Sequence, residues 1–242
     1  MIVDDDGLDL DDLPELALPY ERNTFLWLNN HHSDFWDVFM MIYSGKLLWV
    51  PLCAVLLFVI FYKSKWQNAV LFLLCFILLA TLCDQISASL VKPFFSRLRP
   101  THHPDFMYHV LIVDDYRGGR YGFISSHACN GFGVTTFIAL VFKQRRLTVA
   151  LIAWALLSCY SRIYLGVHFI TDILGGIFLG TLIGFLIYLL FQYCRVKILK
   201  TPLPDMKKPL YTRRHANILI ATLGLTVLFN IIFSLFSIYL YK

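Results

Sequence analysis

Long apolar runs separated by short polar islands are the main pattern along this chain. Stretches such as 71–80 and 182–191 are apolar at every position, unlike membrane β-strands, in which apolar and polar residues alternate. They belong to segments that approach the ~20 residues a helix needs to cross a bilayer. We therefore predict an all-α fold, a polytopic membrane helical bundle of about six transmembrane helices, at residues 36–62, 67–91, 125–142, 147–165, 168–193 and 216–240.

Composition supports a membrane protein. Hydrophobic residues make up 58% of the 242 residues and aromatic residues 16%, and the mean hydropathy is +0.64, all high for a soluble domain. The six cysteines are scattered singly with no C-x-x-C pair, so we interpret them as small apolar filling residues. We expect one transmembrane domain over 36–242.

The start of the chain has a different character. In the N-terminal region 1–35, residues 1–21 carry half of all the acidic residues and no basic segment precedes an apolar core, so we expect no cleavable signal peptide. We predict a mobile acidic tail over 1–20. The segment 24–33, with Phe25, Leu26 and Trp27 before a polar end, is expected to lie at the headgroup level as an interfacial segment.

The basic residues predict the orientation. The formal net charge is +5, and one set of loops holds 12 lysines and arginines while the other holds eight. Because basic loops stay in the cytoplasm, the richer set faces inward. We expect a multi-pass protein of a bacterial cytoplasmic (inner) membrane, with the polar islands on the outer, periplasmic side. The partners expected are the membrane and a lipid, not nucleic acid, and the oligomeric state is open.

Three polar islands border the apolar runs and contain the candidate chemistry. Permanent cations suit the oxygens of a phosphate, and histidine can both attack and donate a proton near neutral pH. The predicted helices bring all three islands to one height, where a helix start adds backbone N–H groups. The islands are Lys92 with Arg99 and Pro100, then Ser125, Ser126 and His127, then Ser161, Arg162, His168 and Asp172.

The third island contains an orienting pair. His168 and Asp172 are four residues apart, so at the start of a helix they share a face and the carboxylate can reach an imidazole nitrogen. Holding one nitrogen as N–H leaves the lone pair of the other free to attack phosphorus. We predict that His168 is the nucleophile and that His127 protonates the leaving group.

In order and spacing, the motifs K-x6-R-P, S-x-H and S-R-x5-H-x3-D resemble the signature of the type 2 phosphatidic acid phosphatase superfamily. The resemblance covers residues 67–193 and implies a phosphohistidine intermediate, no metal and no other cofactor. It implies that His168 is the nucleophile, His127 the acid and Asp172 the partner of His168. It also implies a phosphate-binding set of Lys92, Arg99, Ser125 and Arg162, to which we add Ser126.

The middle motif departs from the family pattern. The family commonly has P-S-G-H, whereas this chain has Ile124, Ser125, Ser126 and His127. Glycine lets a backbone N–H approach phosphate closely, so Ser126 implies either a tolerated turn or a hydroxyl that acts as an extra donor.

The function expected is hydrolysis of a lipid phosphate or lipid pyrophosphate at the outer face of the membrane. The resemblance admits undecaprenyl pyrophosphate, phosphatidylglycerophosphate, phosphatidic acid and the phosphates of lipid A. The alternatives are a lipid phosphotransferase, in which an acceptor hydroxyl replaces water, and a non-catalytic lipid-phosphate binding or transport protein. A haloperoxidase that uses vanadate is a remote third.

Other polar and small residues receive structural interpretations. We expect Arg97 to face lipid headgroups and Asp84 to make a hydrogen bond within the bundle. We also expect a solvated outer loop at Arg117, Arg120 and Tyr121 and a close helix contact at Gly175, Gly176 and Gly180.

Overall fold

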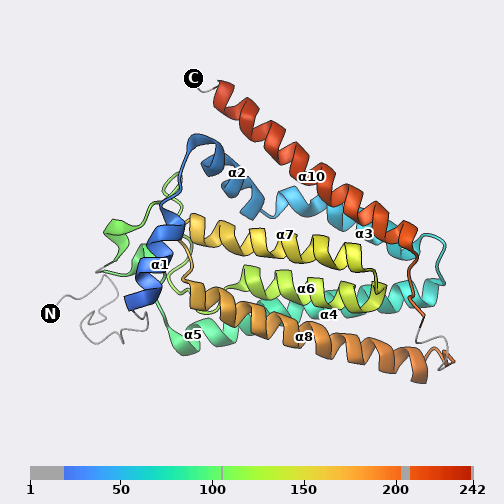
Figure 1. Cartoon of the computed structure of the whole chain (residues 1–242). Coiled ribbons are helices and arrows are strands. Elements are labelled where there is room, and N and C mark those ends of the chain that lie inside the picture. The colour runs from blue at the N-terminus through green and yellow to red at the C-terminus, as the bar shows by residue number, and fades with distance from the viewer. Residues whose placement is uncertain (1–18, 105, 203–207, 241–242) are drawn as a thin grey trace.

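The computed structural model describes residues 19–104, 106–202 and 208–240, so nearly all of the predicted acidic tail lies outside the described residues. The described residues form helices, with one isolated antiparallel bridge between Leu98 and Tyr121. The predicted all-α bundle is confirmed (Figure 1). The helices are α1 (Pro19–Asn29), α2 (Asp34–Ser44), α3 (Val50–Phe61), α4 (Trp66–Gln85), α5 (Lys92–Phe95), α6 (Ser126–Phe142), α7 (Arg145–Tyr164), α8 (Ile170–Lys197) and α10 (Arg213–Leu240).

The length and composition of the helices support four or five of the six predicted membrane crossings. Among the described residues, four helical segments are long and apolar enough to cross a membrane: Trp66–Phe95, α7, α8 and α10. The pair α2 and α3 makes a fifth when it is counted as one broken span. Helix α6, at the place of another predicted crossing, has 17 residues, the lower end of the roughly 17–25 residues of membrane-spanning helices, and it lies inside the bundle between α7 and α8 (Figure 1).

The predicted continuous helix over 36–62 is wrong. Helix α2 ends at Ser44, and the next helical segment, Leu47–Phe61, is bent from it by 68°. Gly45 leaves the helix in an extended conformation, and Pro51 occupies the first turn of α3, where its missing N–H has no helical partner to lose. The two residues therefore end one helix and start another in the middle of an apolar run.

The second predicted helix continues further than residue 91. Between α4 and α5 the chain passes through a π-helical turn, Ile86–Val91, and α5 ends at Ser96, which has a left-handed conformation (φ 46°). Lys92 therefore begins the last helical turn before the outer loop. Inserted π turns of this kind are frequent at functional sites.

Close packing of α6 on α8 aligns the ends that carry the site. A Cβ atom on Gly180 would lie 2.1 Å from the carbonyl oxygen of Cys129, and one on Gly176 would lie 2.5 Å from that of Ser125. Only glycine permits this approach of two backbones. The predicted close helix contact is confirmed, and it places the first residues of α6 beside the first turn of α8.

The segment predicted to be interfacial is largely the helix α1. Phe25 is fully buried between the rings of Phe106 and Phe169, whose centroids are 5.6 and 5.5 Å from its own. Trp27 points outward with 67% of its surface exposed. The Asn29 amide donates a hydrogen bond of 2.8 Å to the carbonyl of Tyr164. Helix α1 is therefore fixed to the protein by one face.

Candidate active site

One cavity of about 440 Å³ collects residues from all three islands. It opens where α5 ends and α6 and α8 begin, between those ends and the break after α2. Of the predicted site residues, three cations, two histidines and one serine contribute to its wall. The predicted site residues on that wall are Lys92, Arg99, Ser126, His127, Arg162 and His168.

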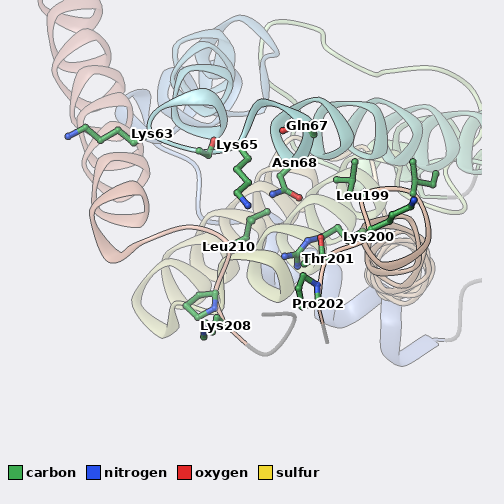
Figure 2. A pocket seen from close by; sticks show the side chains of 14 residues that line it. Lys63, Lys65, Gln67, Asn68, Leu199, Lys200, Thr201, Pro202, Lys208 and Leu210 are labelled. Carbon is green, nitrogen blue, oxygen red and sulfur yellow. The ribbon is translucent and has the colours of Figure 1, made fainter. Parts of the chain in front are cut away.

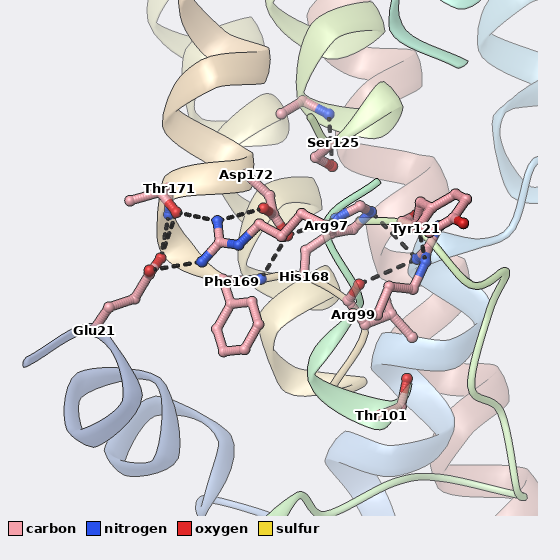
Figure 3. Close-up of polar contacts among 12 residues, drawn as sticks. Glu21, Arg97, Arg99, Thr101, Tyr121, Ser125, His168, Phe169, Thr171 and Asp172 are labelled. Carbon is pink, nitrogen blue, oxygen red and sulfur yellow. Dashed lines mark hydrogen bonds and ion pairs between the residues drawn. The ribbon is translucent and has the colours of Figure 1, made fainter. Parts of the chain in front are cut away.

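The two nitrogens of His168 have different environments. Nδ1 lies 3.3 Å from Oδ2 of Asp172, and Nε2 lies 3.4 Å from Nη1 of Arg99. Asp172 is fully buried behind the histidine, and Oδ2 also accepts a hydrogen bond of 2.9 Å from the Phe169 backbone. An ionised carboxylate on Nδ1 makes that nitrogen the N–H donor, which leaves the lone pair of Nε2 on the side of Arg99 (Figure 3), and both residues line the cavity.

Arg99 is fixed by backbone groups around it. Its Nε donates to the carbonyl of Tyr121 at 3.1 Å and its Nη1 to that of Val167 at 3.1 Å. The outer loop passes close above the guanidinium at Gly118, where a Cβ atom would lie 2.9 Å from Nη1. Burial, with the charge of nearby Arg162, lowers the pKa of Arg99 to about 10, so Arg99 stays charged at neutral pH.

Ser44, which the sequence did not suggest, joins the other two islands. Its hydroxyl accepts a hydrogen bond from Nη1 of Arg162, and its carbonyl accepts one of 3.3 Å from Nε2 of His127. Nη2 of Arg162 also donates to the hydroxyl of Tyr116 at 3.0 Å. The residue that ends α2 therefore holds the side chains of α6 and α7 together at the cavity.

The two serines of the middle motif, both predicted to bind phosphate, lie in different environments. Ser125 is fully buried and is not part of the cavity wall, because its hydroxyl caps α6 by accepting a hydrogen bond from the N–H of Ala128. Ser126 lines the cavity and shares a 2.8 Å hydrogen bond with Ser87 of the π turn. Ser126 is therefore the hydroxyl within reach of a ligand.

Arg97 was predicted to face lipid headgroups, and this is wrong. It is only 7% exposed, with Nη1 2.8 Å from Oδ1 of Asp172 and Nη2 2.8 Å from Oε2 of Glu21. Residues two apart in an extended segment share a face, and the bridge at Leu98 holds this segment extended against Tyr121. Arg97 and Arg99 therefore both reach the His168 and Asp172 pair.

The structure confirms some of the remaining predictions for polar residues and contradicts others. Asp84, which we expected to make a hydrogen bond within the bundle, is exposed and lines the cavity. Lys46, at the break after α2, also lines it, although the sequence placed it inside a membrane helix. Arg117 is exposed, as expected of a solvated loop, whereas the carbonyl of Tyr121 holds Arg99.

Comparison with known families identifies the arrangement. A model described as the PAP2 superfamily matches residues 71–195, which is more than half of the chain and includes all three islands. The chain belongs to the PAP2 superfamily. The resemblance inferred from the motifs is therefore confirmed, and this PAP2 protein is a multi-pass membrane phosphatase that acts on lipid phosphates.

Relatives of this PAP2 protein extend over most of its length. It is 40% identical to a lipid A 4'-phosphatase of Porphyromonas gingivalis over 81% of this chain and 84% of the relative. It is 33% identical to a lipid A 4'-phosphatase of Bacteroides thetaiotaomicron over 78% and 85%. A crystal structure of a PAP2 type phosphatidylglycerolphosphate phosphatase from Bacillus subtilis has the same fold, with a TM-score of 0.56, 22% identity and coverage of 76% and 90%.

A second, larger cavity of this PAP2 protein lies at the opposite end of the bundle (Figure 2). It has a volume of about 660 Å³ and is bordered by the turn before α4, the end of α8 and the segment before α10. Its wall includes Lys63, Lys65 and Lys200, which belong to the loops that the charge distribution assigns to the cytoplasm. None of the predicted site residues lines it, so the candidate chemistry is confined to the smaller cavity.

The burial of His168 has a testable effect on its protonation. Burial, with the charge of Arg99, holds the pKa of His168 well below its ordinary value of 6.5. We expect the ring of His168 to stay neutral at pH 6, where a free imidazole is largely protonated. Nitrogen-15 NMR of histidine-labelled protein, with the signals assigned by their loss in His168→Gln, would check this, and a midpoint near pH 6.5 would contradict it.

The same pKa shift determines the sign of the effect on stability. Below pH 6.5 the unfolded chain takes up a proton at His168 that the native state does not bind. The contribution of His168 to the free energy of unfolding therefore decreases as the pH falls through about 6.5.

Proposed function

We propose that this protein removes the 4'-phosphate of lipid A at the outer face of the cytoplasmic membrane through a phosphohistidine intermediate. The observation that carries the proposal is that Nε2 of His168 faces a cavity with three cations while Asp172 holds Nδ1. The lipid A substrate is supported by the names of the two relatives that match this chain over more than four fifths of their length.

In the first step, Nε2 of His168 attacks phosphorus in line with the ester oxygen. The N–P bond forms as the P–O bond to the lipid breaks, and His127 gives a proton to the departing oxygen. Lys92, Arg99 and Arg162 bind the phosphate oxygens and stabilise the charge that grows on them. Asp172 stabilises the positive charge that develops on the imidazole.

In the second step, water attacks the phosphohistidine. His127, now without its proton, accepts one from the water, and the N–P bond breaks to give free phosphate and neutral His168. The lipid product carries a free hydroxyl where the phosphate was attached. Ser126 and the N-terminus of α6 are close enough to the cavity to hold the phosphate between the two steps.

The outer-face location rests on the charge distribution. The cavity lies at the end of the bundle opposite the basic loops that include Lys63, Lys143 and Arg195. Because loops rich in Lys and Arg are retained in the cytoplasm, the cavity faces the other side. In intact cells an impermeant thiol reagent should label a cysteine introduced at Arg117, whereas one introduced at Lys143 should react only after the cells are lysed, and the reverse labelling would overturn the orientation.

Substrate choice is tested with the purified protein. Lipid A, phosphatidylglycerophosphate, phosphatidic acid and undecaprenyl pyrophosphate are supplied in mixed micelles, free phosphate is measured, and mass spectrometry locates the phosphate lost from lipid A. We expect kcat/KM for lipid A to exceed that for the others by about tenfold or more, with loss at the 4' position. Equal rates, or loss at the other position, would contradict the assignment. Transfer of the phosphate to an added acceptor lipid without release of free phosphate would favour the phosphotransferase, and no turnover at all would favour a binding protein.

A chelator should leave this activity unchanged. The cations on the cavity wall, Lys92, Arg99 and Arg162, bind phosphate directly and repel a divalent cation. We expect the same rate of phosphate release in EDTA as in added Mg²⁺ or Zn²⁺. A loss of activity in EDTA that one metal restores would contradict this mechanism.

A further inference from the structure

The carboxylate behind His168 belongs to a chain of buried charges that reaches the first described helix. Asp172 is 0% exposed, Arg97 7% and Glu21 8%. Nη1 of Arg97 donates to Oδ1 of Asp172 at 2.8 Å, and Nη2 donates to Oε2 of Glu21 at 2.8 Å. The other oxygen of Asp172 faces Nδ1 of His168. The order of contacts is therefore Glu21, Arg97, Asp172 and His168 (Figure 3).

Each member of this chain is fixed by further contacts. Oε1 of Glu21 accepts hydrogen bonds from the backbone N–H of Thr171 at 2.7 Å and from its hydroxyl at 2.6 Å. The guanidinium of Arg97 lies over the ring of Phe169, 4.6 Å from its centroid. A planar guanidinium held on two sides and on its face has little freedom to turn, so Arg97 presents one donor to Asp172 in a fixed direction.

The charges explain why this arrangement serves His168. A carboxyl group that is taken out of water favours its neutral form unless a cation lies beside it. A neutral Asp172 would be a poor acceptor for Nδ1–H and would not stabilise the imidazolium. Arg97 supplies the cation, and Glu21 balances the charge of Arg97 on its other side. Glu21 also lies outside residues 71–195, which the family model matches.

We propose that Arg97, held by Glu21, is a positioning residue that keeps Asp172 ionised and aimed at Nδ1 of His168, so that helix α1 is part of the active site. This inference rests on the proposed phosphohistidine mechanism for its effect on turnover. Its effect on the tautomer of His168 does not depend on turnover. Neither residue lines the cavity, so both would act on the chemical step through Asp172.

The kinetic test compares Arg97→Gln, Arg97→Lys and Glu21→Gln with wild type. We expect Arg97→Gln to lower kcat by about 10- to 100-fold, in line with other residues that orient a catalytic partner, with KM nearly unchanged. The kcat of this variant should recover only at a higher pH than in wild type, because Asp172 ionises at higher pH when no cation lies beside it. Arg97→Lys should be intermediate, because one ammonium group cannot span two carboxylates.

The double variant tests whether Glu21 acts through Arg97. Glu21→Gln should lower kcat less than Arg97→Gln, and the double variant should be no worse than Arg97→Gln alone, because both changes break one chain of contacts. Arg117→Gln and Asp115→Asn, which remove the same charges from exposed loop positions, should behave as wild type. Variants that lose thermal stability but keep kcat and its pH dependence would overturn the inference, because α1 would then only be fastened by these contacts.

The spectroscopic test needs no substrate. In wild type, nitrogen-15 NMR of histidine-labelled protein should show His168 as the Nδ1–H tautomer at pH 7 to 8, and this fixed tautomer should be lost in Arg97→Gln at the same pH. An unchanged tautomer would overturn the inference. A wild type that releases no phosphate but shows the tautomer change would overturn the proposed function and support the positioning role.

Discussion

His168→Gln is expected to abolish phosphate release while the protein stays folded. Glutamine keeps a hydrogen-bonding group of similar size in the space beside Arg99 and Asp172 but cannot form an N–P bond. Loss of a covalent nucleophile costs on the order of 10⁴-fold or more in kcat. The measurement is release of phosphate from lipid A by protein that elutes from size exclusion as wild type does.

Trapping provides the second readout for this variant. Wild type that is mixed with radiolabelled substrate and quenched in base should retain label on His168, because phosphohistidine is stable in base and labile in acid, and His168→Gln should retain none. His31→Gln, at an exposed position at the end of α1, serves as the control for a histidine change and should be fully active. Turnover by His168→Gln at a tenth of the wild-type rate would exclude the nucleophilic role.

His127→Gln is expected to lower kcat on lipid A by about 10²- to 10⁴-fold, the usual contribution of a general acid and base. The size of the loss should depend on the leaving group. Nitrophenolate is a good leaving group that departs without taking up a proton. With a lipid-like phosphate ester of nitrophenol as substrate, the first step therefore does not need His127. The second step still does, because water must lose a proton as it attacks the phosphohistidine.

This difference predicts a burst. His127→Gln should release about one nitrophenolate per enzyme molecule quickly and then turn over slowly, with the phosphohistidine accumulating. Wild type should give a steady rate. Equal slowing of both steps without a burst would show that His127 serves another purpose, such as holding the carbonyl of Ser44, which is 3.3 Å from its Nε2.

The sequence predicted the residues that local order and spacing specify. Lys92, His127 and His168 are at helix ends that the apolar runs delimit, so their common height follows from the lengths of the helices. The break after Ser44 had signals in Gly45 and in Pro51 six residues later, but the surrounding apolar run was interpreted as one helix. Ser125 had a signal too, because serine immediately before a helix commonly caps it.

Other parts of the site depend on contacts that no local pattern predicts. Glu21 pairs with Arg97 across 76 residues, and Ser44 pairs with Arg162 across 118. Judged by its sequence neighbours alone, Arg97 is typical of a basic residue at a membrane surface. Its burial follows from the extended pairing of Leu98 with Tyr121 and from the way α1 lies over the start of α8, both of which are properties of the folded chain.

These long separations have a consequence for biogenesis. The ribosome delivers a chain from its N-terminus, so α1 and α2 are complete long before their partners exist. The hydrogen-bond partner of Glu21, Thr171, is synthesised 150 residues later. Ser44 likewise pairs with Arg162, which is synthesised 118 residues later. A nascent chain that has not yet inserted α8 lacks the groups that orient His168, so hydrolytic competence cannot precede the insertion of α8.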